Sequence, residues 1–328
     1  MGQAGHLFCF GYGYTCDYLG HALLEKGWKV SGTTRSLEKR EELKSRGIHA
    51  HIFDQDKPLP DAYGLLDGVT HVLISTPPDD NGDTAYNWHG RELAGVPSIR
   101  WAGYLSTTGV YGDRNGEWVD ETSELRPTSK RGTRRLEAEN QWLGLHKNLD
   151  LPMHIFRLAG IYGPGRSALD SVRAGVARRI NKPGHVFGRI HVEDIVQVVL
   201  ASMAQPNAGS IYNVCDSNPA ASHEVIAYAC ELLGRPVPPM IDFEEANLAP
   251  ITRSFYLDNR RVRNTKIKEE LGVALKYDDY KAGLEACRAA ENFALTLFKK
   301  REESDGYSGG SGSSSSSSSS SGGSSGLF

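Results

Sequence analysis

Several features are missing from this sequence, and each absence excludes a class of protein. No apolar run approaches the ~18 residues that a membrane-spanning helix needs. Cysteines are few: the five are scattered without metal-type spacing, and an odd number in a long chain predicts reduced, buried thiols. The sequence therefore argues against a membrane protein, a disulfide scaffold and a cysteine metal centre.

The sequence also lacks a strong excess of either charge. Its formal net charge is -3 in 328 residues, which argues against a bulk role on nucleic acid or on an anionic membrane. The basic run 126–135 contains no aromatic residue on which a base would stack, so we expect no nucleic-acid partner there. Since the first predicted strand begins near His6, no room is left for a targeting peptide, and we expect a cytoplasmic protein.

The end of the chain has too few apolar residues to fold. Residues 301–328 are dominated by glycine and serine, above all after Ser308. Such a segment cannot bury enough apolar surface to offset its ordering entropy, so we predict a disordered tail. Residues 1–300 are long enough for one large α/β domain.

In residues 1–300 short apolar runs alternate with longer segments of helical periodicity. Strands separated by helices of about ten residues or more predict βαβ units, and therefore an α/β fold with a doubly wound (Rossmann) parallel sheet. After Gly165 this alternation loosens, which predicts a small C-terminal lid from about residue 167. The expected strands are 7–10, 28–33, 48–53, 71–75, 99–106, 153–157 and 211–214, and the expected helices are 17–26, 37–46, 129–146, 168–180, 195–203, 222–233, 261–271 and 277–299.

The turn after the first strand predicts a dinucleotide site. Gly11 permits a tight turn, Gly13 lets a pyrophosphate approach the backbone, and the N-terminus of the helix that follows offers free N–H groups. A G-x-G pattern alone is a weak signal. Here the strand, the glycines, the helix and the next strand follow in the right order, which favours dinucleotide binding over a purely structural turn.

The ends of the next strands predict which dinucleotide binds. An NAD enzyme usually places an acidic residue after the second strand to hold the ribose 2′-OH, whereas this chain has Thr34 and Arg35. Arginine pairs with a 2′-phosphate, so we expect NADP, with NAD as the alternative; a solvated helix-start arginine is the competing interpretation of Arg35. Asp54 follows the third strand, where it would accept a hydrogen bond from the adenine amine or simply form a turn.

A fourth strand end completes the predicted cofactor site. Ser75, Thr76 and Pro77 follow the strand 71–75 and would lie beside the pyrophosphate and the nicotinamide ribose. The prolines would shape a rigid turn in either case.

Four segments carry a resemblance to a known superfamily. They are 11–14 (GYGY), 105–112 (LSTTGVYG), 157–166 (RLAGIYGPGR) and 189–195 (RIHVEDI). Together they resemble the extended short-chain dehydrogenase/reductase superfamily, the group of UDP-galactose 4-epimerase and the nucleotide-sugar dehydratases. The resemblance covers about residues 6–295, and within the group the chain is most similar to atypical bacterial epimerase-like members.

The resemblance implies a proton-transfer pair that this chain does not supply. It places Thr107 as the hydroxyl that holds a substrate oxygen and, on the next long helix, a tyrosine four residues before a lysine. Counting from Pro127 and from Glu139 leads instead to Arg131 and Arg135. Arginine stays protonated and cannot act as a base near neutral pH, so any activity would need another group.

Three interpretations of the missing pair remain open, and a fourth, purely structural one applies to the two arginines. An enzyme would use another group, with Tyr111 the nearest phenol. A non-catalytic protein would bind NADP as a sensor or partner-binding module. Alternatively, Arg131 and Arg135 grip an anionic substrate with their planar forks, or form a solvated face paired with nearby glutamates.

The substrate side of the site is the least specified part of the prediction. Arg157 and Arg166 flank the turn after the sixth strand, and the resemblance puts Arg157 on the nicotinamide side and Arg166 in the lid cleft. We therefore expect an NADP-dependent oxidoreductase or epimerase whose partner is an unidentified small molecule, with anions favoured, and no metal. The resemblance also implies pairing of two chains through the long helix that carries Arg131.

Overall fold

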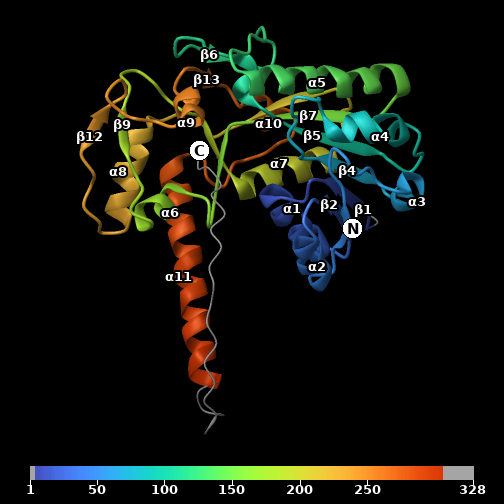
Figure 1. Ribbon diagram of the computed structural model, residues 1–328, viewed down its shortest axis with the longest axis horizontal. Helices are drawn as coiled ribbons and strands as arrows, with labels where there is room; N and C mark the ends of the chain where they lie inside the picture. Colours follow the sequence, from blue (N-terminus) through green and yellow to red (C-terminus); the bar gives the residue numbers. More distant parts are fainter. Residues whose placement is uncertain (1–3, 306–328) are drawn as a thin grey trace.

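The computed structural model describes residues 4–305 of the chain (Figure 1). The last helix, α11, spans Tyr280–Asp305, so the predicted tail boundary at residue 301 falls inside a helix. The rest of the predicted tail, from residue 306, lies outside the described residues. None of the helices in the described range is both long enough and apolar enough to span a bilayer.

A seven-stranded, wholly parallel sheet forms the centre of the fold, which confirms the predicted fold class. Its strand order is β11-β7-β5-β4-β1-β2-β3, so the direction of winding reverses between β1 and β4. The crevice at such a reversal, outside the carboxyl ends of the strands, is where doubly wound folds bind ligands. The strands are β1 (His6–Phe10), β2 (Lys29–Thr34), β3 (His49–Ile52), β4 (His71–Ile74), β5 (Trp101–Thr107), β7 (Met153–Leu158) and β11 (Ile211–Val214).

Helices cover both faces of this sheet, as Figure 1 shows. The central strands are apolar almost throughout because both of their faces are buried. Side chains of α1 (Tyr14–Leu24), α2 (Leu37–Ser45) and α7 (Val192–Ala204) pack into one apolar core. Side chains of α3 (Ala62–Leu66), α4 (Thr84–Ala94) and α5 (Lys130–Leu149) pack into the other.

Two of these helices, α3 and α4, were not expected from the sequence. The α4 segment reads TAYNWHGRELA, and its buried face includes His89 and Gly90, which do not read as apolar. Asp83 starts this helix by accepting a hydrogen bond from the backbone N–H of Tyr86, which is the usual work of an N-cap carboxylate.

The lid is built from separate segments, which corrects the predicted boundary near residue 167. The strand β11, expected in the lid, pairs with β7 at the edge of the main sheet, and α7 packs against α1 in the main core. The lid proper contains α6 (Ala168–Arg173), β9 (Arg179–Asn181), α8 (Ser222–Leu232), β12 (Met240–Asp242), α9 (Pro250–Phe255) and the start of α11.

Short elements join the lid to the sheet. The expected helix 168–180 ends at Arg173, and Gly175 then takes a left-handed conformation with φ +69°. The expected helix 261–271 is a strand followed by a shorter helix. These connecting elements are the 3-10 turn η1 (Thr108–Tyr111), β6 (Trp118–Val119), β8 (Gly160–Tyr162), β10 (Arg189–His191), β13 (Arg261–Val262) and α10 (Thr265–Glu269).

Candidate functional site

A cavity of about 750 Å³ lies between the carboxyl ends of the sheet strands and the lid. Ser75 and Thr107 line it from the sheet, Arg131 and Arg135 from α5, and Phe255 from the lid helix α9. This volume is in the range of small-molecule sites, which run from roughly 300 to 1,000 Å³. The cavity therefore brings together residues that the sequence assigned to cofactor and to substrate.

The glycine turn between β1 and α1 fits a dinucleotide. Gly11 has φ +80°, and a Cβ built there would lie 2.8 Å from Cγ2 of Thr76, so only glycine fits. A Cβ built at Gly13 would meet nothing within 4 Å, so the space outside this residue is open. Gly13 caps α1 without a side-chain hydrogen bond, which leaves the first N–H groups of the helix for an anion.

The strand end at β4 adds a second sign of a ligand. The Thr76 hydroxyl, beside Gly11, is buried and has no hydrogen-bond partner in the described part of the chain. An unpaired buried hydroxyl costs free energy that a ligand oxygen would recover. Ser75 lines the cavity, whereas Pro77 is exposed. These residues fit the pyrophosphate of a dinucleotide.

The structure leaves Arg35 available to a ligand at the end of β2. Arg35 is exposed, and within residues 4–305 its guanidinium has no hydrogen-bond or ion-pair partner. The Thr34 hydroxyl accepts a hydrogen bond from the Ser36 N–H at 3.3 Å. Asp54 accepts one from the Asp56 N–H at 2.9 Å, which is the turn-forming role. The contacts of these three residues with a cofactor stay predictions.

Thr107 lines the cavity from the carboxyl end of β5. It is the last residue of β5 and caps η1, and its Oγ1 accepts a hydrogen bond from the Gly109 N–H at 3.0 Å. This bond fixes the orientation of the side chain and leaves the hydroxyl proton free to be donated. The placement agrees with a role in holding a substrate oxygen.

Tyr111 does not reach the cavity, so the prediction that it acts as the catalytic phenol is wrong. Its hydroxyl is fully buried, donates to Oδ1 of Asn213 at 2.7 Å and accepts from Arg157 at 3.0 Å. Burial raises the pKa of Tyr111 to about 12, even though Arg157 opposes that shift. The phenol is therefore a satisfied core group.

Arg157 likewise belongs to the core, which corrects its assignment to the substrate. Its guanidinium forms a salt bridge with Glu139 at 2.8 Å, and the two side chains are 2% and 1% exposed. The Ser106 hydroxyl donates to the same carboxylate. This cluster fastens α5 to β5 and β7 behind the cavity wall, and it also removes Glu139 as a partner for Arg135.

The remaining predicted arginines do lie on the cavity, and their partners are rings or carbonyls. Arg135 donates to the Leu105 carbonyl and to the Tyr104 hydroxyl. The Arg131 guanidinium lies 4.4 Å from the ring centroid of Phe255. No carboxylate forms a salt bridge with either arginine among the described residues, so the solvated face paired with glutamates is not present.

Arg166 lies beside the dinucleotide crevice. Its guanidinium is 5.7 Å from the ring centroid of Tyr14, at the start of α1. The Tyr14 hydroxyl donates to the Pro164 carbonyl at 3.0 Å and so links α1 to the turn after β8. Arg166 therefore faces the cofactor end of the cavity.

The cavity is much more basic than the sequence suggested. Its described lining has one carboxylate, Asp258, and six arginines: Arg131, Arg135, Arg166, Arg178, Arg189 and Arg260. Of these six, only Arg260 forms a salt bridge with a carboxylate, at 3.1 Å from Asp258. Arg189 donates instead to the carbonyls of Phe187 and Ala220. Sequence reasoning did not single out Arg178, Arg260 or Asp258, because distant segments of the chain bring them together.

Two of the cavity arginines, Arg189 and Arg260, are also desolvated by burial. Desolvation lowers the pKa of both Arg189 and Arg260, with nearby acidic groups acting in the opposite direction. Both guanidinium groups remain charged, because arginine does not lose its proton in proteins. Uncompensated positive charge in a partly enclosed cleft produces a potential that attracts anions.

Comparison with known proteins places the chain in a family. A sequence profile of the NAD dependent epimerase/dehydratase family matches residues 11–215. Protein YeeZ of Escherichia coli K12 is 27% identical over 282 residues, covering 82% of this chain and 95% of YeeZ.

Solved structures agree with this fold. A structure described as a functionally unknown conserved protein from Silicibacter pomeroyi is 51% identical, has a TM-score of 0.81, and the match covers 88% of this chain and 99% of that one. UDP-glucose 4-epimerase of Thermotoga maritima, solved with UDP-glucose, is 16% identical with a TM-score of 0.73, and the match covers 89% and 99% of the two chains. With its matched segment and its parallel sheet, the chain belongs to the NAD dependent epimerase/dehydratase family.

Proposed function

We propose that this protein is an NAD(P)-dependent oxidoreductase or epimerase that acts on a small anionic molecule. The observation that carries the proposal is the arginine-lined cavity, which begins at Ser75 and Thr107 beside the dinucleotide crevice. Five of its six arginines have no carboxylate salt bridge in the described structure. A fold that keeps several cations together without carboxylate partners loses free energy through their mutual repulsion unless an anion binds among them.

The solved relatives support the same class of ligand. One structural neighbour is a dTDP-glucose 4,6-dehydratase and another is an epimerase solved with UDP-glucose, and the phosphates of both sugar nucleotides are anions. Arginine suits phosphate and carboxylate because its planar fork donates two parallel hydrogen bonds. We therefore assign Arg131 and Arg135 to an anionic group of the substrate.

The proposed mechanism omits the proton-transfer pair of the superfamily. Arg131 and Arg135, on the first turns of α5, take the positions that the sequence count gave to that pair. In this proposal Thr107 would orient the reacting oxygen, the arginines would hold the substrate and stabilise negative charge that develops on that oxygen, and water would supply or take up the accompanying proton. A bound dinucleotide supplies the hydride chemistry. Gly11, Gly13 and Thr76 would hold its pyrophosphate, with Tyr14 and Ser75 beside it.

We infer that the preferred dinucleotide is NADP, although the family is NAD-dependent as a class. The reason is Arg35, an exposed cation without a protein partner in the described residues, at the strand end that meets the adenosine ribose. An acidic residue at this strand end would favour the 2′-OH of NAD, and the segment 33–36 contains none.

The experiment begins with the purified protein and any nucleotide that it carries. Mass spectrometry identifies the nucleotide, and calorimetry compares NADPH with NADH. Spectrophotometry then follows NADPH oxidation with sugar nucleotides, with other anionic carbonyl compounds and with neutral analogues of matched size. We expect turnover of anionic compounds only.

Helix α5 supplies a matched control for the anion assignment. Arg131→Gln and Arg135→Gln should each weaken binding of an anionic ligand by about tenfold or more, since hydrogen bonds to charged groups contribute about 1.5–3 kcal/mol. Arg134→Gln should not, because Arg134 pairs with Asp80 and does not line the cavity. Equal losses in all three variants, or a preference for neutral compounds, would contradict the proposal.

The second candidate is a non-catalytic NADP-binding sensor or partner-binding protein. What favours it is the pair of arginines at positions where the superfamily places its acid–base groups, because arginine does not exchange a proton near neutral pH. Tight NADPH binding, together with no NADPH oxidation across the whole panel, would support this candidate over the enzyme.

A further inference from the structure

We propose that Asp258 selects a hydroxyl group on the ligand, so that the cavity takes a hydroxylated anion rather than an anion alone. This inference rests on the proposed function and adds a specificity-determining residue to it. Asp258 is the one carboxylate among the described lining residues of a cavity that six arginines surround. Guanidinium groups only donate hydrogen bonds, whereas an ionised carboxylate only accepts them.

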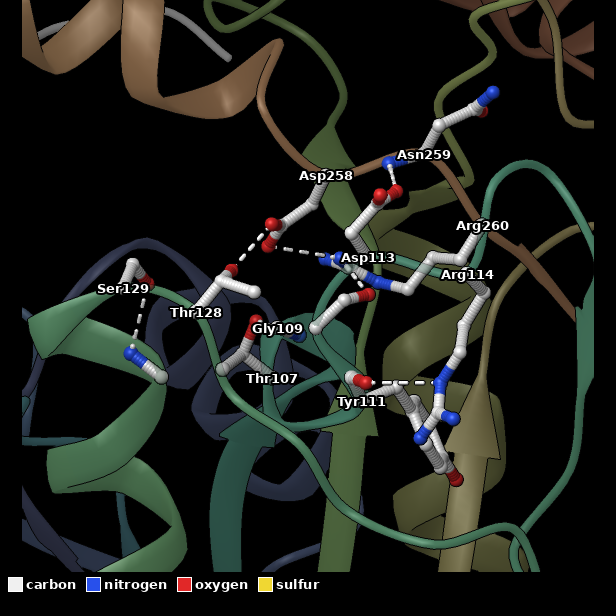
Figure 2. A network of polar contacts seen from close by, with 12 residues as sticks. Thr107, Gly109, Tyr111, Asp113, Arg114, Thr128, Ser129, Asp258, Asn259 and Arg260 are labelled. Atoms are coloured by element: carbon white, nitrogen blue, oxygen red, sulfur yellow. Dashed lines mark hydrogen bonds and ion pairs between the residues drawn. The ribbon is translucent and has the colours of Figure 1, made fainter.

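Two hydrogen bonds hold the carboxylate of Asp258 in one orientation, and it can accept further hydrogen bonds. Oδ1 accepts from the Thr128 hydroxyl, and Oδ2 accepts from Nη1 of Arg260 at 3.1 Å. Figure 2 shows these two contacts on either side of the carboxylate. A carboxylate offers about four acceptor positions, so about two remain. The side chain is 12% exposed and lines the cavity, so a ligand can reach these positions.

The segment that carries Asp258 is held firmly in place. The next residue, Asn259, donates its backbone N–H to Asp113 at 2.8 Å, and its carbonyl accepts from the Gly116 N–H at 2.9 Å. Its side-chain amide donates to the Gly184 carbonyl and accepts from the Val186 N–H. These bonds tie the segment to the loop after η1 and to the lid. A binding group held on a rigid support loses little entropy when its ligand binds.

The Asp258 contact also lies next to the arginine cluster. Thr128, which holds Asp258, comes directly before Ser129, the N-cap of α5, and Arg131 follows within the first turn. Arg260 donates to the Gly112 carbonyl at 2.9 Å, which places its guanidinium against the turn that starts at Thr107. One ligand can therefore place its anionic group at the arginines and a nearby hydroxyl at Asp258.

The same arrangement discriminates against ligands without the hydroxyl. An anion that offers only acceptors or apolar groups at Asp258 would desolvate the carboxylate without pairing it, and it would add like-charge repulsion if its own negative group came close. Sites built to pair with a substrate hydroxyl reject analogues that lack it much more strongly than apolar pockets reject a missing methylene.

The experiment measures calorimetric affinities of the full chain for two matched pairs of anions. One pair is glycerol 3-phosphate with propyl phosphate, and the other is gluconate with hexanoate. We expect the hydroxylated member to bind at least tenfold more tightly in at least one pair. Asp258→Asn should reduce that ratio to within about threefold. The control Asp67→Asn, an exposed carboxylate outside the cavity, should leave the ratio unchanged.

The outcomes separate this inference from the proposed function. Equal affinities within both pairs in the wild-type protein would overturn the role of Asp258, and this comparison needs no variant to fold. A preference that survives Asp258→Asn in a folded protein would overturn it as well. If no anion of either pair binds, the arginine-lined anion site fails, and the inference fails with it. Arg131→Gln should weaken both members of a pair alike, leaving their ratio in place.

Discussion

The Arg35→Asp substitution should reduce the affinity of the protein for NADPH much more than its affinity for NADH. Arg35 is exposed at the end of β2 and makes no hydrogen bond or ion pair within the described chain, so its replacement removes no contact that holds the fold. The variant puts a carboxylate where the 2′-phosphate of NADP would lie. The same carboxylate suits the free 2′-hydroxyl of NAD.

The expected loss of NADPH affinity follows from the exposed position of Arg35. A charge-assisted hydrogen bond to phosphate contributes about 1.5–3 kcal/mol, which corresponds to about a tenfold to 150-fold loss of NADPH affinity. Repulsion between the new carboxylate and the phosphate adds to the loss, by about 1 kcal/mol in water at close range. NADH affinity should change by less than about threefold, or rise.

Titration calorimetry with both dinucleotides at two salt concentrations provides the measurement. The NADPH loss should shrink as salt rises, because exposed charges are screened beyond about 8 Å at physiological ionic strength. Lys26→Asp makes the same change in net charge at an exposed position of α1's C-terminal turn and should leave both affinities unchanged. Equal losses for NADPH and NADH in Arg35→Asp would refute the assignment of Arg35 to a 2′-phosphate.

Three further predictions address the crevice and the buried charges. Gly13→Val should leave the thermal unfolding midpoint within a few degrees, since the space at its Cβ is open, but should reduce dinucleotide affinity at least tenfold in fluorescence titration. Glu139→Ala should lower the free energy of unfolding in urea by about 3–5 kcal/mol, because it leaves the buried Arg157 guanidinium unpaired; a loss below 1 kcal/mol would contradict the burial argument. Burial raises the pKa of Asp216 to about 8, with Arg189 opposing the shift, so the folded protein holds a proton there that the unfolded chain releases. Stability should therefore fall as pH rises from about 4 to about 8, and Asp216→Asn should flatten this part of the unfolding-versus-pH curve.

The dinucleotide edge could be predicted from the residues because its signals are local. Gly11 and Gly13 act through the backbone of one turn, at the carboxyl end of a strand that a short apolar run predicts. The role of Arg35 at the end of β2 stays a prediction. The parallel sheet follows from the same runs, since strands buried on both faces must be apolar throughout. Helix α4 was missed although the residues that it buries, among them Ala85, His89 and Leu93, recur at helical spacing, because histidine and glycine on that face do not read as apolar.

Tyr111 and Arg157 show where local reasoning fails. Both lie in segments that resemble the site of related enzymes, yet their side chains turn into the core toward Asn213 and Glu139. The direction of a side chain at a strand end depends on which helix packs there and on which buried partner that helix supplies. The sequence of the motif alone does not specify that partner.

The cavity shows which features the sequence determines and which depend on the tertiary structure. Strand and helix signals within a few tens of residues specify the strands, most of the helices between them and the glycine turn, because each depends on neighbours along the chain. The strand order, in which β1 pairs with both β2 and β4, is decided by tertiary packing. The substrate half joins Arg131, Arg178 and Asp258 from segments far apart in sequence. Their shared positive potential, and the single carboxylate within it, arise only when packing of the lid onto the sheet brings those charges into one low-dielectric space.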